Sequence, residues 1–162
     1  MPRLSRATKN EGATKSNDPL HSGLFVHSMP GHLVRRLQQV AVRLFSDEVN
    51  GDLTPVQFAA LCAINDRPNI GQAALAALIG YDRATMGGVI DRLEQKGFVA
   101  RVASAEDRRS NALALSAAGH KVIAAVKPKV EAVQQSLLAP LSDAEQRQFE
   151  AMCLKLLAHH RG

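Results

Sequence analysis

Aromatic residues are scarce in this chain of 162 residues, at 4% of the sequence, and tryptophan is absent. Alanine and leucine fill the apolar positions instead, and both favour helix over sheet. No apolar run is long enough to cross a membrane. The first segment, MPRLSRATKNEGATKSND, lacks the apolar centre of a secretory signal. We therefore predict a mainly helical, cytoplasmic protein that has no membrane partner.

Cysteine is also scarce, with Cys62 and Cys153 in apolar helical segments far apart along the chain. Two such residues make neither a disulfide framework nor a zinc motif, so we expect buried, reduced thiols. The histidines, such as His27 and His32, are not spaced with cysteine or carboxylate as metal ligands are. The sequence therefore predicts no metal and no cofactor.

The chain is moderately basic, with a net charge of +5 and a pI of about 9.6. This balance suits an anionic partner, either nucleic acid or an acidic membrane surface. The charge is not concentrated, because residues 81–110 hold six Lys/Arg and five Asp/Glu. The faces that the charges occupy are therefore more informative than their sum.

Helical periodicity and capping signals divide the chain into segments. Residues 1–20 are polar and basic, and we expect a disordered tail. Apolar residues at three- and four-residue steps predict a first helix within 24–49, beginning properly around Ser28. A capping box at Thr54 predicts a helix to about Asn65, and Gly80 ends a short helix over 72–79.

Two longer helices are expected after residue 115. Ser116 is a suitable cap for a helix that continues to about Leu138, with a kink at Pro128. A second capping box at Ser142 predicts a last helix through about His159. The apolar stripe of this last helix is Phe149, Met152, Cys153 and Leu156, and we expect both cysteines to face the core.

A helix from Asp82 to about Lys96, ended by Gly97, has the most unusual surface. Its inward stripe is Met86, Val89, Ile90 and Leu93, and its outer face carries Ala84, Gly88, Asp91 and Gln95. The adjacent glycines, Gly87 and Gly88, cost about 1 kcal/mol each relative to alanine. Such a helix suits close approach to another surface, either the DNA major groove or a tightly packed neighbouring helix.

A basic hairpin follows this helix. Residues 98–101 and 112–115 alternate as short strands, and the polar linker 103–111 joins them. Three short helices and a hairpin over 53–115 have the order of a winged helix-turn-helix, whose second paired helix enters the major groove. We expect Asp107 to hold an arginine, and Asp91 to pair with a nearby arginine. A solvated charged turn is the alternative. The predicted DNA contacts are Arg83, Thr85, Gly87, Gly88, Arg92, Gln95, Asp107, Arg108 and Arg109.

The stretch GQAALAALIGYDRATMGGVIDRLEQKGFVARVASAEDRRSNALALSAAGHKV resembles the MarR family of bacterial transcription regulators. The resemblance depends on RLEQKGFVAR, the Asp-x-Arg wing at Asp107–Arg109, and LSAAG, and it extends over residues 24–160. It implies a single domain over 21–162, a homodimer joined by helices within 24–49 and 116–160, and a pseudo-palindromic operator. The paired glycines depart from the family pattern, so the base contacts of that helix stay open.

The resemblance also implies an effector beside the first helix, where a small ligand often releases the DNA. An arginine and an imidazole in a partly apolar cleft suit a small aromatic carboxylate. The segment HSGLFVHSMPGHLVRRLQQ is similar to members that repress aromatic-acid or nicotinate catabolism. Solvated arginines or dimer salt bridges are the alternative. The predicted ligand-binding residues are His21, His27, Ser28, His32, Arg35 and Arg36.

The sequence thus predicts a mainly α protein with a small β-hairpin wing, acting as a homodimeric repressor released from a catabolic operon by an aromatic or nicotinate-type acid. Two alternatives stay open: a redox- or metal-responsive regulator, and a winged-helix module that binds protein. An enzyme is not expected, because the chain has no nucleophile motif, phosphate loop or paired catalytic carboxylates.

Overall fold

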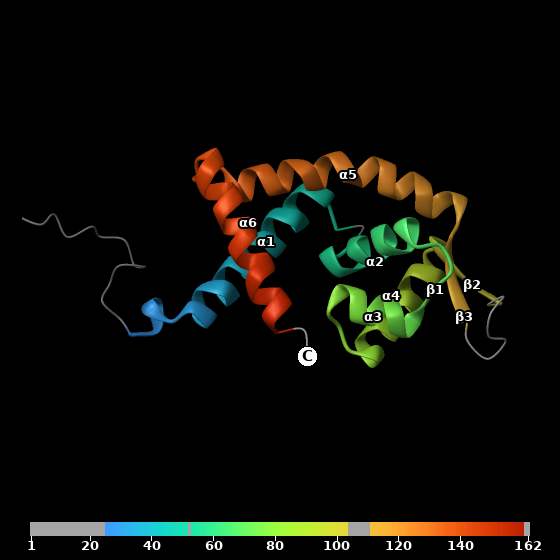
Figure 1. The fold of residues 1–162 in the computed structure, drawn as a ribbon. Coiled ribbons are helices and arrows are strands. Elements are labelled where there is room, and N and C mark those ends of the chain that lie inside the picture. The colour runs from blue at the N-terminus through green and yellow to red at the C-terminus, as the bar shows by residue number, and fades with distance from the viewer. Residues whose placement is uncertain (1–24, 52, 104–110, 161–162) are drawn as a thin grey trace, which may run out of the picture. The chain divides into compact units, whose positions relative to one another are not determined.

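A computed structural model describes residues 25–51, 53–103 and 111–160. The chain falls into two compact units, Met1–Gln38 and Gln39–Gly162, and the boundary lies within the first α-helix. The predicted disordered tail and His21 lie outside the described residues. The elements, in the order of Figure 1, are η2 (Phe25–Ser28), α1 (Pro30–Val49), α2 (Pro55–Asp66), β1 (Ile70–Gly71), α3 (Gln72–Ile79), α4 (Arg83–Gln95), β2 (Val99–Ala103), β3 (Asn111–Leu115), α5 (Ala117–Leu138) and α6 (Asp143–His159).

The described part of the first unit is a 3₁₀ turn followed by the start of α1. The Ser28 hydroxyl donates to the Phe25 carbonyl at 2.8 Å, and α1 begins at Pro30 rather than at Ser28. Proline is tolerated there because the first helical amides have no partner within the helix. None of the described residues of this unit is buried. Phe25 and Val34 are exposed, at 81% and 65%.

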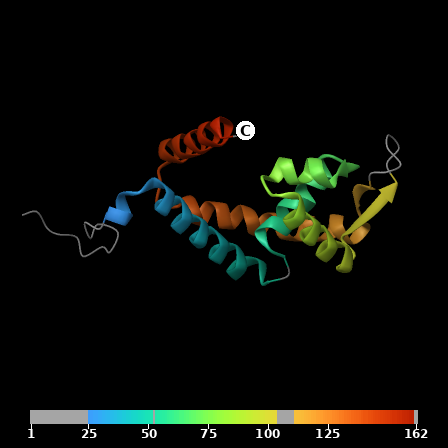
Figure 2. The same cartoon turned by 90° about the horizontal axis from the view of Figure 1, so that it is seen from below.

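The core of the second unit lies where α2, α3 and α4 meet the small sheet (Figures 1 and 2). Every one of these helices contributes fully buried side chains, and α4 contributes the stripe that the sequence predicts. α2 begins at the predicted capping box, where Thr54 and Gln57 exchange hydrogen bonds. The largest fully buried residues are Leu61, Ile64, Leu75, Met86, Ile90, Leu93 and Leu113.

The sheet has three antiparallel strands in the order β1-β3-β2. β2 and β3 form the predicted hairpin, with Val99 opposite Leu115 and Ala103 opposite Asn111. β1 was not predicted, because two residues are too few to show alternation. It forms where Asn69, at a φ of 66°, turns the chain so that its amide donates to the Leu113 carbonyl at 3.2 Å.

The last two helices differ in how much they bury. α5 places Val126 and Val133 in the core, and it continues on both sides of Pro128, so the proline does not end the helix. The kink predicted there stays a prediction. α6 begins at the predicted capping box of Ser142 and Glu145, yet it buries no side chain. In the single chain, two residues of its predicted apolar stripe, Met152 and Leu156, are exposed, and the other two, Phe149 and Cys153, are half-buried.

Within the described ranges, no helix is both long and apolar enough to span a membrane.

Candidate nucleic-acid interface

The turn between α3 and α4 is fixed by backbone hydrogen bonds. Gly80 ends α3 at a φ of 80°, and the amides of Gly80 and Tyr81 both donate to the Ala76 carbonyl, at 3.0 and 2.9 Å. This left-handed conformation favours glycine, because it places a Cβ too close to the backbone. The helix-turn-helix predicted from the sequence is therefore confirmed, together with its glycine.

Asp82 caps the start of α4, as predicted. One carboxylate oxygen accepts the Thr85 amide at 2.8 Å, and the other accepts the Thr85 hydroxyl at 2.5 Å. These hydrogen bonds, the hydroxyl first, hold the pKa of Asp82 below its usual value. The Thr85 hydroxyl proton is thus already engaged, and a donated bond to a phosphate would require it to leave Asp82.

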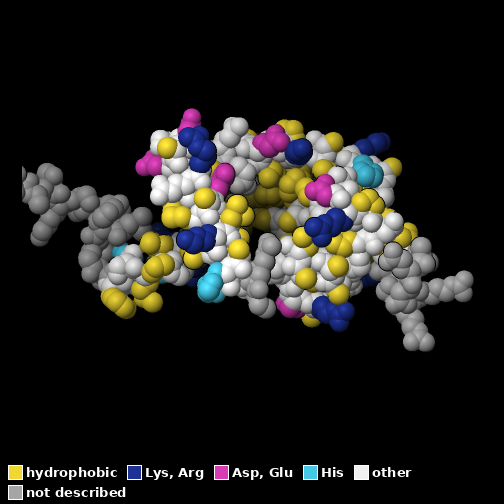
Figure 3. Space-filling model, in the orientation of Figure 1, with side chains coloured by type: hydrophobic (Ala, Val, Ile, Leu, Met, Phe, Trp, Pro, Cys, Tyr) yellow, Lys and Arg dark blue, Asp and Glu magenta, His cyan; other side chains and the backbone are white. Residues whose placement is uncertain are grey.

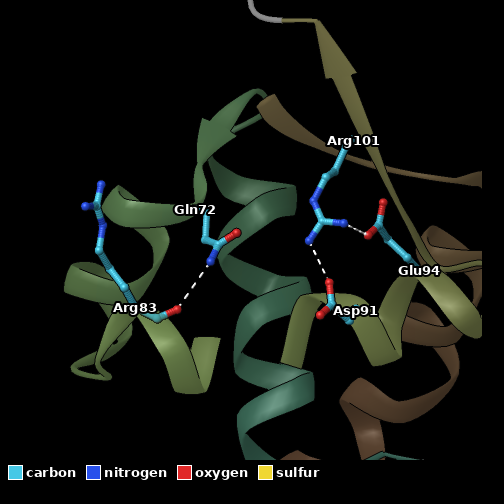
Figure 4. Close-up of polar contacts among 5 residues, drawn as sticks. All are labelled: Gln72, Arg83, Asp91, Glu94 and Arg101. Atoms are coloured by element: carbon cyan, nitrogen blue, oxygen red, sulfur yellow. Dashed lines mark hydrogen bonds and ion pairs between the residues drawn. The ribbon is translucent and has the colours of Figure 1, made fainter. Parts of the chain in front are cut away.

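Gln72 links the beginning of α3 to the beginning of α4 (Figure 4). Its side-chain Nε2 donates to the Arg83 carbonyl at 3.2 Å. The same atom lies 3.1 Å from the position that a Cβ on Gly87 would take. A side chain at residue 87 would require the Gln72 amide to shift by a few tenths of an ångström. For Gly87, the structure therefore supports the alternative of close packing against the neighbouring helix.

Gly88 has a different environment. It is exposed, and a Cβ added to it would meet nothing within 4 Å among the residues that the structure describes. Described packing therefore does not account for a glycine in the middle of α4. The remaining predicted contacts of this helix are also exposed, two in its first turn and two near its end: Arg83, Thr85, Arg92 and Gln95.

The acidic residues of α4 are paired with a single arginine from β2 (Figure 4). Arg101 contacts Asp91 at 2.7 Å through Nη2, and it contacts Glu94 through Nη1. The bond with Asp91, and the charges of Glu94 and Asp91, raise the pKa of Arg101 against the opposing effect of burial. The predicted pairing of Asp91 is confirmed. Sequence reasoning missed that Arg101 is the partner and that Glu94 shares it.

The tip of the predicted wing, with Asp107, Arg108 and Arg109, lies outside the described residues. The strands on either side are described, and the pairing of Ala103 with Asn111 brings the two ends of the linker together. The hairpin is therefore confirmed, while the roles of its tip residues stay predictions.

The LSAAG motif joins α5 to the end of α4. The Ser116 hydroxyl donates to the Gly97 carbonyl at 2.6 Å, and the Ser116 amide donates to the Phe98 carbonyl at 3.0 Å. The same hydroxyl accepts the Gly119 amide and so caps α5. A Cβ on Gly119 would lie 2.2 Å from the Phe98 oxygen. Serine and glycine are therefore required by contacts that the motif alone does not reveal.

The predicted ligand residues of the first unit lie on η2 and early α1, except His21, which is not described. Arg35 Nη2 lies 3.3 Å from His32 Nδ1, and the rings of His27 and His32 are 5.7 Å apart. Burial first, then Arg35, His27 and Arg36, lowers the pKa of His32. The Nε2 atom of His32 is enclosed and has no hydrogen-bond partner among the described residues.

Cys62 and Cys153 are half-buried rather than buried as expected. Burial, and then the charge of Asp66, raises the pKa of the Cys62 thiol against the effect of Lys127. A thiol with a raised pKa has little thiolate at neutral pH, which disfavours a redox role for Cys62. Over the described residues, no three His, Cys, Asp or Glu side chains are placed to hold a metal ion.

A small cavity of about 150 Å³ lies beside the start of α5. Its lining residues come from α2, β3, α5 and the turn after α2, and none belongs to the predicted ligand set: Ile64, Asn65, Pro68, Ala114, Leu115 and His120.

A short helix pair with a glycine turn, followed by a β-hairpin, defines a winged helix-turn-helix protein. The MarR family model matches residues 53–110 of the chain. The transcriptional regulator HosA of Escherichia coli is 35% identical over 126 residues, which are 78% of this chain and 93% of HosA. The chain therefore belongs to the MarR family, whose matched relatives are transcriptional regulators and not enzymes.

Other similar proteins bear on the ligand and on DNA. The repressor NicR of Pseudomonas putida is 27% identical over 143 residues, 88% of each chain. PcaV of Streptomyces coelicolor, solved with its natural ligand, superposes with a TM-score of 0.80 at 30% identity and covers 87% of this chain and 99% of its own. BpsR of Bordetella bronchiseptica, whose DNA binding is regulated by 6-hydroxynicotinic acid, superposes with a TM-score of 0.77 at 29% identity. The match covers 80% of this chain and 93% of BpsR. A mutant of E. coli MarR complexed with operator DNA superposes with a TM-score of 0.76 at 27% identity. The match covers 84% of this chain and 99% of the MarR chain.

Proposed function

We propose that this MarR-family regulator is a homodimeric repressor that binds a specific, pseudo-palindromic operator through α4. The observation that carries the proposal is the exposed face of α4, which presents Arg92 and Gln95 beside the small residue Gly88, with Arg83 exposed in the first turn. A helix fixed after a glycine turn, with donors on its free face, suits base edges and phosphates in the major groove. The likeness to a MarR–operator complex supports this orientation.

The contacts divide by chemistry. Arg83 and Arg92 are the candidates for guanine edges or phosphates, and Gln95 is a candidate for adenine or phosphate. Thr85 offers its methyl group more readily than its proton, which Asp82 holds. In the wing, Arg108 and Arg109, steadied by Asp107, are proposed to enter the adjacent minor groove. In this scheme residues 53–115 form the DNA-binding lobe.

A second copy of the chain is the proposed cover for α6. Apolar side chains lie at the surface over this helix (Figure 3), and Met152, Leu154, Leu156 and Leu157 are exposed by 50%, 66%, 60% and 59%. Exposed apolar clusters of this kind mark protein–protein contacts. Pairing through the helices within 24–49 and 116–160 would give a two-fold axis, which matches a palindromic site.

The proposed effector is a small aromatic or heteroaromatic carboxylate of the nicotinate type, whose binding releases the DNA. Arg35 donates to His32 Nδ1, so a neutral His32 carries its proton on Nε2, the enclosed atom that has no described partner. An acceptor on the ligand would satisfy that donor, and Arg36 would bind the carboxylate. BpsR, whose DNA binding is regulated by 6-hydroxynicotinic acid, supports a ligand of this class, and PcaV, solved with its natural ligand, supports a ligand-responsive regulator.

A gel shift on the DNA upstream of the protein's own gene, at several salt concentrations, tests the operator. We expect binding that falls steeply with salt and that Arg92→Ala or Arg109→Ala weakens, because each removes a cation at the phosphates. Arg67→Ala, which removes an exposed cation just after α2 that is not among the predicted contacts, is the matched control and should leave affinity unchanged. The absence of a specific shift on any genomic fragment would contradict the proposal.

A thermal-shift panel tests the effector. Nicotinate, 6-hydroxynicotinate, benzoate and salicylate should raise the melting temperature of the wild type, and at least one should release operator DNA. Arg36→Ala and His32→Phe should lose the stabilisation, whereas Arg43→Ala, on the same helix, should retain it. Equal stabilisation of all four chains would remove Arg36 and His32 from the site.

A further inference from the structure

The helix proposed to enter the major groove carries two carboxylates. Asp91 lies on its exposed face, one turn after Gly88, and Glu94 follows three residues later. Residues three apart on a helix are neighbours. Two negative charges on a surface that approaches phosphates weaken the attraction on which DNA binding depends. A helix that binds DNA therefore needs a positive charge that offsets these two carboxylates.

Arg101, which lies outside the helix, supplies this positive charge. It extends from β2, and its two terminal nitrogens engage different carboxylates: Nη2 lies 2.7 Å from Asp91, and Nη1 contacts Glu94 (Figure 4). A guanidinium can do this because its donors form a rigid planar fork, which a lysine ammonium lacks. The side chains are 33%, 57% and 26% exposed for Arg101, Asp91 and Glu94, so the cluster lies at the surface.

We infer that Arg101 is a positioning residue for DNA binding, which acts by masking Asp91 and Glu94 rather than by contacting DNA. The inference rests on the proposed function of α4. With Arg101 the cluster has one positive and two negative charges, and without it neither carboxylate keeps an ion pair with a described residue. Exposed ion pairs contribute little to folding stability. The effect of Arg101 therefore falls on DNA affinity and on its salt dependence, while the fold is retained.

Four chains separate masking from direct contact: wild type, Arg101→Ala, Asp91→Asn/Glu94→Gln, and the variant that combines all three substitutions. Affinity is measured by fluorescence anisotropy on the fragment that the wild type shifts. Arg101→Ala should bind roughly tenfold more weakly at low salt, with a smaller loss at high salt. The triple variant should return to within about threefold of wild type, because no carboxylate remains to be masked.

The acid-to-amide pair in the presence of Arg101 is a second test that does not need Arg101→Ala to fold. Asparagine and glutamine keep a carbonyl oxygen for Arg101, so the geometry is retained while the repulsion is removed. This variant should bind DNA more tightly than wild type. Arg67→Ala, which removes an exposed cation at the end of α2, is the matched charge control and should change affinity by less than about twofold.

Three results would overturn the inference while the proposed function stands: Arg101→Ala binds like wild type, the triple variant stays as weak as Arg101→Ala, or the acid-to-amide pair binds no tighter. The second of these would assign Arg101 a direct contact with DNA. A wild type that binds no genomic fragment overturns the proposed function itself, and the inference with it.

Discussion

Replacing Gly119 with alanine tests how closely α5 approaches the end of α4. The position that the new Cβ would take lies 2.2 Å from the backbone oxygen of Phe98 and 3.2 Å from a methyl carbon of Leu115. Ordinary van der Waals contact begins near 3.4 Å, so the methyl group would be about 1.2 Å too close to a carbonyl. A backbone carbonyl held by a hydrogen bond cannot rotate away as the end of a flexible side chain can.

The expected loss follows from three contributions. Relieving such an overlap costs about 1 to 3 kcal/mol in a packed region. The Phe98 oxygen also accepts the Ser116 amide at 3.0 Å, and separating the two segments would break that bond, which contributes about 1 kcal/mol. Alanine returns up to about 1 kcal/mol through its helix propensity. We therefore expect the free energy of unfolding to fall by roughly 1 to 3 kcal/mol, and the melting temperature by about 3 to 10 °C.

Thermal and urea denaturation, followed by circular dichroism, measure this change. Gly31→Ala is a matched control, because it makes the same substitution in the first turn of α1, where a Cβ would meet nothing within 4 Å. That variant should be neutral or slightly stabilised. If Gly119→Ala melts at or above the wild-type temperature, the close approach of Gly119 to Phe98 is not a constraint and the reasoning fails.

Three further predictions concern single residues. Gly88→Ala should stabilise α4 by about 1 kcal/mol in thermal melts yet weaken operator binding; unchanged affinity would show that DNA does not approach this position. The Thr85 hydroxyl and amide lower the pKa of Asp82, so the ionised carboxylate stabilises the folded protein. This stabilisation is present above the unfolded-state pKa and is lost as the pH falls through the lower folded-state pKa. Asp82→Asn should lack this dependence in urea melts between about pH 3 and pH 6. Cys62, whose pKa burial and Asp66 raise, should react with a disulfide reagent at pH 8 more slowly than glutathione does; a faster reaction would restore the redox alternative.

Local chemistry was sufficient to predict most of the helices. Thr54, Asp82, Ser116 and Ser142 are all observed as caps, because a cap depends on a side chain and an amide three residues away. The inward stripe of α4 was predictable for the same reason, since its spacing reflects the helix period alone. The hairpin β2–β3 also follows from alternation within one short segment.

Features that join distant segments were not predictable. β1 exists because Asn69 and Ile70 lie against Leu113, more than forty residues away. Nothing in the order of residues shows that the Gln72 amide would occupy the space beside Gly87, so two adjacent glycines with different environments looked alike. The apolar spacing of α6 predicts a buried face but does not say which molecule buries it.

The contacts at Ser116 bear on how effector binding could affect α4, the helix proposed to bind DNA. α5 is proposed to belong to the dimer contact. Its N-cap residue, Ser116, donates hydrogen bonds to the carbonyls of Gly97 and Phe98, which lie between α4 and β2. The short Ser116–Gly97 hydrogen bond and the close approach of Gly119 to Phe98 leave little room for one segment to move without the other. Closely packed contacts of this kind transmit a displacement rather than absorb it. A change in the direction of α5 would therefore move the end of α4 and the base of the wing together. In the proposed dimer such a movement would alter the separation of the two α4 helices, which must match successive turns of the major groove.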